Sequence, residues 1–549
     1  MRAKIKTFSI IIVFAILLLT GLLSYQDYGL STDEEACHFR AVVTAKYISE
    51  TVGLKVTFPD TIPAMADYSD RDHGVLFDLV AYGLERLLGL QDSKQIFIFK
   101  HLLTFLVFFA GLIAFYQLVT RRLKDWRWGL LGAVMLFLSP RLFADAFYNA
   151  KDLVFMVTYL IAMSTASSLF EKPTLGRTLV HGLATAVAIA TRVMGIVLIP
   201  ATIFFLLLPQ KRIYIAPEPW SRRLGRIAAY LAVSLVLTIL FWPMLWSNPL
   251  ENFAAAFQSL SRFERWSKEV LLMGRFYLST DLPWYFSLVW IALTTPLLYL
   301  GLFLAGLADW LRRVLIQQKL RFWQQSEALA DTFFQALFWG PLVSVVIFNS
   351  VLYDGWRQLY FIYPAFLIIA LTGLQTLSQM FNGKKLIWNV ILAGIVTLSL
   401  GSTAIWMFRA HPLQNVYFNT LASSDWRSQY DLDYWGLANR AALEAIVASD
   451  PSEQILIAEI SAASVSESFR ILEPQDRARL SLIPFDSVAN SAAAAPQQPL
   501  YVFNNYKRQK DPDILDRDPA YVRFYEKKVA GETILTVYQW VGPSNEVHP

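Results

Sequence analysis

The sequence has 549 residues, of which 55% are hydrophobic and 15% aromatic, and its formal net charge is +5. This much apolar content, arranged in long uncharged runs, excludes an ordinary soluble globular protein. The Lys and Arg residues cluster in short segments between the apolar runs, which is typical of orientation signals and not of a nucleic-acid-binding surface. The single cysteine, Cys37, excludes an intrachain disulfide and a cysteine-based metal site.

The apolar runs predict a polytopic α-helical membrane protein with about eleven transmembrane helices. The first run follows Arg2, Lys4 and Lys6 and has no small-x-small cleavage site after it, so we expect a retained anchor with a cytoplasmic N-terminus. Residues 178–208 are too long for one span, and we expect two short helices there with Thr191 and Arg192 at the turn. The predicted spans are 8–24, 96–120, 128–141, 153–170, the two within 178–208, 227–246, 284–308, 331–350, 358–377 and 387–407.

The basic loops set the expected orientation. Segments 121–127, 209–226 and 309–330 are rich in Lys and Arg and are therefore expected in the cytoplasm. The long loops 25–95 and 247–283 are then external, as is the C-terminus. Residues 1–410 form the predicted transmembrane domain.

Residues 411–549 predict a second, external α/β domain, because the long apolar runs stop near 408. Segments 454–460, 500–504 and 533–540 have the pattern of strands, and 436–448 has helical spacing. Residues 492–498 are expected to form a loop.

The expected topology places most unexplained polar residues on one side of the membrane. Ionised groups at membrane depth are costly unless they are paired or lie in a water-lined site, so their convergence on the external side indicates a functional site. These residues are Asp33, Glu34, Glu35, Asp70, Arg71, Asp72, His73, Arg141, Asp145, Lys151, Asp152, Arg192, Arg275, Asp281, Tyr353, Asp354 and Arg357.

Each of these groups also has a structural alternative. Thr32 and Glu35 have the spacing of a helix capping box, and the segment 70–74 could be an ordinary turn. Lys151 and Asp152 could flank the mouth of a span. Arg357 lies beside aromatic residues and could be an interfacial anchor. Arg192 interrupts an apolar stretch of about thirty residues, which makes a purely structural role harder to accept.

Several segments resemble the GT-C glycosyltransferases, in particular the superfamily of protein O-mannosyltransferases and aminoarabinose (lipid A) transferases. The resemblance covers about residues 1–410, and the order and spacing of the motifs carry it. The motifs are Asp33-Glu34, Asp72-His73-Gly74 to Asp78 (with Gly and Val where relatives often have two prolines), Tyr148-Asn149-Ala150-Lys151-Asp152, Ala190-Thr191-Arg192 to Gly195, and Trp356-Arg357 to Tyr360 and Pro364.

The resemblance implies a bacterial inner-membrane enzyme that transfers a sugar, with inversion, from a polyprenyl-phosphate donor to an acceptor hydroxyl at the external face. An external site also lacks access to cytoplasmic nucleotide sugars, which favours a lipid-linked donor. Asp33 is the expected general base, and Glu34 is a second catalytic candidate with an orienting or metal-binding role. The expected substrate-binding residues are His73, Lys151, Asp152, Arg192, Arg357 and Tyr360.

Three questions stay open at the level of sequence. A transporter or lipid flippase is the main alternative function, although no internal repeat is evident. A scaffold protein that acts through its external domain is a further alternative function. The acceptor is a glycolipid, a glycan or a protein hydroxyl. No ligand spacing demands a metal ion, but Asp33, Glu34, His73 and Asp152 offer oxygen and nitrogen atoms suited to a divalent cation.

Overall fold

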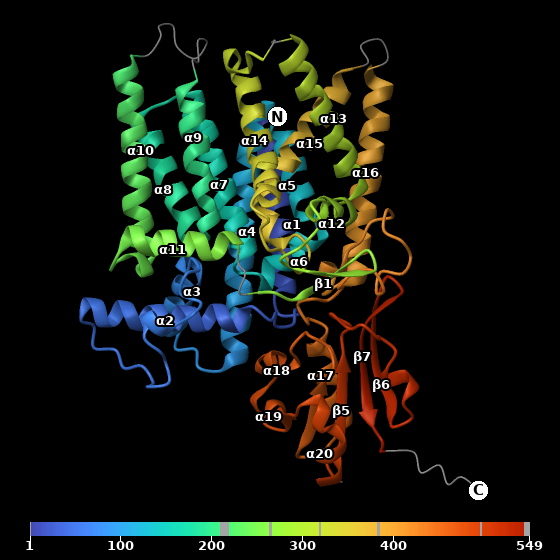
Figure 1. Cartoon of the computed structure of the whole chain (residues 1–549). Coiled ribbons are helices and arrows are strands. Elements are labelled where there is room, and N and C mark those ends of the chain that lie inside the picture. The colour runs from blue at the N-terminus through green and yellow to red at the C-terminus, as the bar shows by residue number, and fades with distance from the viewer. Residues whose placement is uncertain are drawn as a thin grey trace.

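The computed structural model describes residues 2–208, 219–262, 266–317, 320–380, 385–494 and 497–542. Within these ranges the chain forms a bundle of long helices with a smaller sheet-containing part at one end (Figure 1). The first helix starts at the opposite end of the bundle (Figure 1).

The predicted spans correspond to apolar helices of the bundle. Seven described helices are long and apolar enough to cross a membrane singly, and a pair bent by 69° raises the number to eight. The chain is therefore a multi-pass membrane protein, as predicted. The seven are α1 (Arg2–Ser24), α4 (Ser93–Leu123), α7 (Asp152–Glu171), α10 (Trp220–Phe241), α14 (Ser326–Ile347), α15 (Tyr363–Gln379) with the 3-10 turn Arg357–Ile362, and α16 (Lys385–Ala410).

The other predicted spans lie on shorter helices, because proline or an extended residue interrupts them. Pro140 and Pro296 each stand where one helix ends and another begins, since proline lacks the N–H that would continue the preceding helix. These helices are the bent pair α5 (Trp126–Phe137) and α6 (Pro140–Tyr148), then α8 (Leu175–Thr191), α9 (Leu198–Leu207), α12 (Phe286–Thr294) and α13 (Leu297–Leu311).

The predicted break at Thr191 and Arg192 is confirmed. Arg192 is extended and ends α8, and a 3-10 turn (Val193–Val197) leads into α9. Gly74 packs against this break: a Cβ atom at Gly74 would lie 2.4 Å from the carbonyl oxygen of Thr191. A glycine at this position therefore allows the loop that carries His73 to approach Arg192.

The two long loops contain more regular structure than the sequence suggested. Helices α2 (Glu34–Val52) and α11 (Pro249–Arg262) lie across the end of the bundle, with α3 (Leu76–Leu88) and the hairpin of β1 (Glu269–Leu272) and β2 (Arg275–Leu278) nearby (Figure 1). Leu87 and Leu250 are 79% and 88% exposed. Apolar side chains exposed on helices that lie across the bundle end are typical of the membrane interface.

The part after α16 contains a mixed five-stranded sheet with strand order β4-β3-β5-β7-β6. Strand β3 pairs in parallel with β4 and β5, whereas β7 pairs antiparallel with β5 and β6. The strands are β3 (Ile455–Glu459), β4 (Leu480–Leu482), β5 (Leu500–Asn504), β6 (Tyr521–Val529) and β7 (Glu532–Trp540); the helices are α17 (Asn439–Ser449), α18 (Val465–Ser468), α19 (Pro474–Arg477) and α20 (Val488–Ala494).

The sequence predicted three of these strands and α17, but missed two strands and the three short helices α18, α19 and α20. Strand β4 has only three residues, and the edge strand β6 carries Arg523, Glu526, Lys527 and Lys528, so neither has a strong apolar pattern. The prediction of a loop at 492–498 was wrong for Ala492–Ala494, which belong to α20. Residues 495 and 496 lie outside the described ranges. An alanine run favours a helix over a loop.

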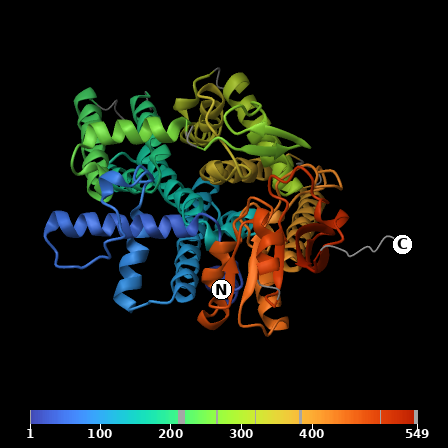
Figure 2. The same ribbon diagram turned by 60° about the horizontal axis from the view of Figure 1, so that its bottom comes forward.

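Buried contacts join the sheet-containing part to the bundle. Trp435 is fully buried and stacks edge-on against Tyr148 of α6. A Cβ atom at Gly29, in the segment between α1 and α2, would lie 2.4 Å from the carbonyl oxygen of Leu437. Figure 2 shows this part beside α2 over the same end of the bundle. We keep the division near residue 410 as a proposal and call residues 411–542 the C-terminal domain.

Candidate functional site

A cavity of about 550 Å³ lies between the end of the bundle and the C-terminal domain. We call it the polar cavity. Four parts of the chain build it: the start of α2 with Asp33 and Arg40, the loop with Asp70 and His73, the bundle residues Lys151, Tyr353 and Asp354, and the C-terminal-domain residues Ser464, Glu467, Lys507 and Arg508. Trp266 contributes an aromatic ring stacked on Tyr353 at 3.8 Å between ring centroids.

A second, smaller cavity of about 70 Å³ adjoins the first and shares His73, Lys151 and Tyr353 with it. We call it the apolar cavity because aliphatic side chains dominate its lining. Its polar contribution includes Arg192, at the break between α8 and α9. The aliphatic residues are Val193, Met194, Leu260, Val345, Val351, Leu352 and Leu359.

A network of charges connects the two cavities. Arg357 donates to Asp152 at 2.8 Å and to Asp33 at 3.3 Å, and lies 3.5 Å from Asp354. Arg192 forms an ion pair with Asp152, and the ammonium of Lys151 lies 3.6 Å from Asp33. Three cations and three carboxylates from distant parts of the chain are therefore in contact.

The members of this network differ in how accessible they are. Arg357 and Asp152 are each 1% exposed, and the Arg357 guanidinium also stacks on Trp435 at 4.6 Å. Lys151 and Arg192 are 13% and 17% exposed and line the cavities, and Asp33 is 32% exposed. A ligand can therefore reach Lys151, Arg192 and Asp33. Arg357 and Asp152 lie behind the cavity walls and fix the positions of these groups through ion pairs.

Local backbone structure positions the two acids. Asp152 is the first residue of α7, and its N–H donates to the side chain of Asn149 at 2.9 Å. Asp33 is the residue before α2 and makes no side-chain cap. Burial opposes ionisation of Asp33, but Lys151 and Arg357 outweigh it and hold the pKa of this carboxyl well below its ordinary value.

Four predicted site residues line neither cavity: Asp152 and Arg357, described above, and Glu34 and Tyr360. Glu34 is 2% exposed and turns into the bundle, where it lies 3.0 Å from His101 and accepts from the N–H of Ser31 at 2.8 Å. Tyr360 is 1% exposed, and its hydroxyl lies 3.4 Å from Asp145. Their predicted roles stay predictions, and their positions favour support of the site over direct contact with a substrate.

The structure also decides between some of the alternatives. The capping-box interpretation was wrong, because α2 has no side-chain cap and Glu35 pairs with Arg470 of the C-terminal domain. Arg357 is too deeply buried to be an interfacial anchor.

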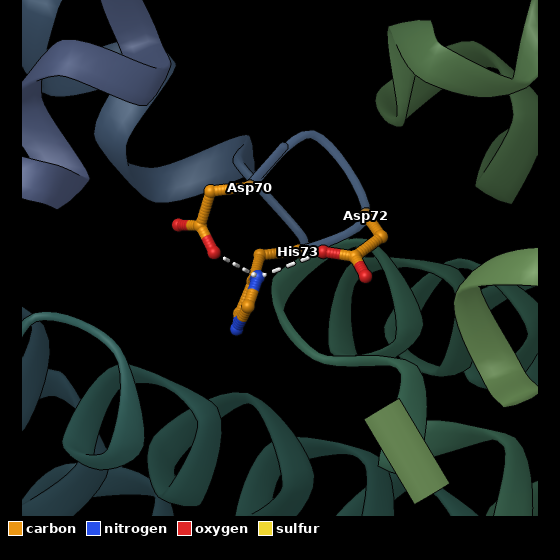
Figure 3. Close-up of side chains that lie close together, drawn as sticks. All are labelled: Asp70, Asp72 and His73. Carbon is orange, nitrogen blue, oxygen red and sulfur yellow. Dashed lines mark hydrogen bonds and ion pairs between the residues drawn. The ribbon is translucent and has the colours of Figure 1, made fainter. Parts of the chain in front are cut away.

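His73 belongs to a cluster in the loop between α2 and α3. Its Nδ1 atom lies 3.1 Å from oxygens of both Asp70 and Asp72, and Figure 3 shows the imidazole between the two carboxylates. The three ligand atoms lie within 4.8 Å of one another and could hold a metal ion. Of the residues expected as metal ligands, only His73 is in this group.

The charges of this cluster already have protein partners. Arg40 forms an ion pair with Asp70, and the hydroxyl of Ser259 donates to Asp72 at 2.6 Å. Although burial opposes it, hydrogen bonding from His73 and the charge of Arg40 lower the pKa of Asp70. The acids are thus stabilised as carboxylates by protein groups.

Sequence reasoning missed several residues of the polar cavity. Arg40 and Trp266 lie within the loops that were expected to be external, but no motif marks them. Glu467, Lys507 and Arg508 come from the C-terminal domain, where charged residues are ordinary and therefore carry no signal. Only the folded structure brings these residues to the site.

Comparison with family models and with curated protein sequences found no match. Comparison with solved structures found the same fold. ArnT from Cupriavidus metallidurans, solved in complex with undecaprenyl phosphate, is 14% identical with a TM-score of 0.50, over 97% of this chain and 98% of that chain. The oligosaccharyltransferase AglB from Archaeoglobus fulgidus, in complex with an inhibitory peptide and a dolichol-phosphate, is 11% identical with a TM-score of 0.52, over 99% of this chain and 75% of that chain.

These likenesses extend over the bundle and the C-terminal domain together. At such low identities they establish the fold. The chain therefore has the polytopic helical fold of the GT-C glycosyltransferases, as its motifs predicted.

Proposed function

We propose that this protein is a membrane glycosyltransferase that moves a sugar from a polyprenyl-phosphate donor to an acceptor hydroxyl, with Asp33 as the general base. The observation that carries the proposal is the junction of the two cavities. There the accessible cations Lys151 and Arg192 stand beside an apolar space on one side and the carboxylate of Asp33 on the other.

The apolar cavity, at about 70 Å³, suits the phosphate end of the donor and not its whole hydrocarbon chain. A polyprenyl phosphate combines a hydrocarbon chain with an anionic head, and the cavity combines aliphatic walls with Arg192 and Lys151. Arginine offers two parallel N–H donors that match a phosphate, and lysine adds a point charge. The lipid ligands of the two structural neighbours, undecaprenyl phosphate and dolichol-phosphate, are of this chemical class.

The polar cavity suits the acceptor, because it is larger and faces Asp33. In the transfer, the acceptor oxygen attacks the anomeric carbon and the bond from that carbon to the phosphate oxygen breaks. Polyprenyl phosphate leaves with the bonding electrons, and Asp33 takes the proton of the hydroxyl. Attack from the side opposite the phosphate inverts the anomeric carbon.

The low pKa of Asp33 fits this role once the donor is bound. In the unliganded site, Lys151 and Arg357 neutralise the carboxylate and make it a weak base. A phosphate that binds to Lys151 draws this cation away and adds a negative charge near Asp33. Both changes raise the pKa of Asp33, so the base becomes stronger when the donor is in place.

The Lys and Arg distribution favours an external site. Arg121 and Arg122 lie in the last turn of the 31-residue helix α4, and the first residue of that helix, Ser93, contacts Arg470 of the C-terminal domain. These cations therefore lie at the bundle end far from the cavities, and basic segments are retained in the cytoplasm. We therefore place the site and the C-terminal domain outside, at the surface of a bacterial inner membrane.

Binding and turnover of defined lipids test the proposal. Purified protein in nanodiscs should bind undecaprenyl phosphate and should not bind undecaprenol, which lacks the anion, in native mass spectrometry. It should also release undecaprenyl phosphate from at least one member of a panel of undecaprenyl-phosphate sugars when cell-membrane glycolipids are added. Equal binding of the two lipids, with no release from any donor, would contradict the proposed function.

A further inference from the structure

The C-terminal domain presents to the polar cavity the edge of its sheet where ligands commonly bind. Strands β3 and β5 are parallel neighbours, and the segments that follow them carry Ser464, Glu467, Lys507 and Arg508. Open α/β sheets bind ligands outside the carboxyl ends of their parallel strands. The wall of the cavity is therefore built from the part of the domain that is best suited to hold a ligand.

Contacts with the bundle fix this wall in position. Lys507 is 5% exposed and lies 3.0 Å from Asp354, which in turn lies 3.5 Å from Arg357. Within the C-terminal domain, Lys507 also donates to the carbonyl oxygen of Tyr434 at 2.8 Å, and the N–H of Arg508 donates to Asp431 at 2.9 Å. The segment after β5 is thus tied to the same charge network as Asp33.

Glu467, on α18, is the residue of this wall whose hydrogen bonding is incomplete. It lines the polar cavity together with Asp33, and its Oε2 atom is buried without a hydrogen-bond partner among the described residues. A buried carboxyl oxygen that lacks a partner is costly. Because Glu467 itself lines the polar cavity, rotation of its carboxyl group toward a ligand that donates a hydrogen bond would remove that cost.

The surroundings of Glu467 favour a neutral or hydrogen-bond-donating ligand over an anion. Burial, followed by the charges of Glu35, Glu459 and Asp33, raises its pKa to about 7, while Lys507 acts in the opposite direction. Near neutral pH this carboxyl is therefore in equilibrium between its protonated and ionised forms. A hydroxyl group can donate to one form and accept from the other.

We propose that Glu467 is an acceptor-binding residue, which holds a hydroxyl of a saccharide acceptor against the C-terminal domain while Asp33 engages the hydroxyl that attacks. Two carboxyl groups in one cavity can bind two hydroxyl groups of the same sugar unit, and a saccharide carries several hydroxyl groups on each unit. A cavity of about 550 Å³ lies in the range of small-molecule sites, so it admits a sugar unit. This inference rests on the proposed function and extends it to the acceptor.

The test separates acceptor binding from donor binding. The variants are Glu467→Ala and Glu467→Gln, and Glu453→Ala is the control, since Glu453 is an exposed glutamate of the same domain. The probe for the acceptor is the glycolipid extract of the cell membrane, titrated against an undecaprenyl-phosphate sugar that the wild type turns over. The measured quantities are the half-saturating amount of extract, the rate at saturation and the binding of undecaprenyl phosphate.

We expect Glu467→Ala to raise the half-saturating amount of extract roughly 10- to 100-fold, the loss expected for a hydrogen bond to a charged group. Glu467→Gln should lose less, because its carbonyl still accepts. Both should bind undecaprenyl phosphate as the control does. An unchanged half-saturating amount in Glu467→Ala would overturn the inference, and so would a parallel loss of undecaprenyl phosphate binding. A wild type that binds no undecaprenyl phosphate and releases none refutes the proposed function, and the inference falls with it.

Discussion

Replacement of Lys151 by alanine should weaken donor binding with little loss of stability. The Lys151 ammonium lines both cavities and lies 3.6 Å from Asp33, which is 32% exposed. A partly exposed pair at this distance contributes at most about 1 kcal/mol to folding. A charge-assisted bond to a lipid phosphate contributes about 1.5–3 kcal/mol, which corresponds to a dissociation constant roughly 10- to 100-fold higher in the variant.

Replacement of Arg357 by alanine provides the contrasting case. Arg357 and Asp152 are each 1% exposed and lie 2.8 Å apart, and removal of one partner of a buried pair costs about 3–5 kcal/mol. The cost should be near the lower value, because Asp152 keeps Arg192 and Asp33 keeps Lys151. Arg357→Ala should therefore melt well below the wild type.

The assay measures undecaprenyl phosphate binding by native mass spectrometry and thermal unfolding by intrinsic fluorescence, on the same nanodisc samples. We expect Lys151→Ala to bind weakly and melt near the wild-type temperature. The exposed fractions assign donor binding to Lys151 and structural support to Arg357. This assignment would be refuted if Lys151→Ala bound the donor like the wild type while Arg357→Ala bound it weakly and melted normally.

Four further predictions follow from individual residues. Asp33→Asn should reduce transfer about 10²–10⁴-fold while undecaprenyl phosphate still binds; near-normal turnover would remove Asp33 as the base. Arg192→Ala should weaken donor binding and Arg192→Lys should restore only part of it, because lysine lacks the paired donors; equal affinities would make Arg192 a structural partner of Asp152. The raised pKa of Glu467 stabilises the folded protein fully below about pH 4.5, and this stabilisation is lost as the pH rises through about 7. The melting temperature of the wild type should therefore fall relative to that of Glu467→Gln between pH 5 and 8. Melting temperatures that change with pH in the same way in both proteins would contradict this assignment. In a Cys37→Ser background, Glu453→Cys should react with an impermeant maleimide in spheroplasts and Arg127→Cys should react only after permeabilisation; the reverse pattern would invert the topology.

The bundle was predictable because its physical signals are local and strong. Long apolar runs and basic loops mark membrane helices without any knowledge of their packing. The break at Arg192 was predictable for the same reason, since a cation within about thirty apolar residues cannot lie in lipid without a partner. Internal pairing of Arg192 with Asp152 and of Arg357 with Asp354 was also a structural alternative open from the sequence, because all four residues belong to the polar group expected at the external side, and the structure contains both pairs.

The roles of neighbouring residues were harder to predict. Asp33 and Glu34 are adjacent in sequence, but Asp33 lines the polar cavity and Glu34 pairs with His101 inside the bundle. Successive residues at the start of a helix point about 100° apart, and only the packing of α2 decides which one faces the cavity. Glu467 and Lys507 depend on how the C-terminal domain docks, which no local pattern encodes.

The most direct test of the central claim is to locate the donor in the protein. An undecaprenyl phosphate with a diazirine near its phosphate end would be photocrosslinked to the protein in nanodiscs, and the labelled peptides would be identified by mass spectrometry. We expect labels on the residues that line the apolar cavity, which include 192–194, 350–353, 358 and 359, and a strong decrease in the variant that combines Lys151→Ala and Arg192→Ala. Labels elsewhere on the bundle, for example in the apolar groove between α1 and α16, at a level that this variant does not change, would contradict it.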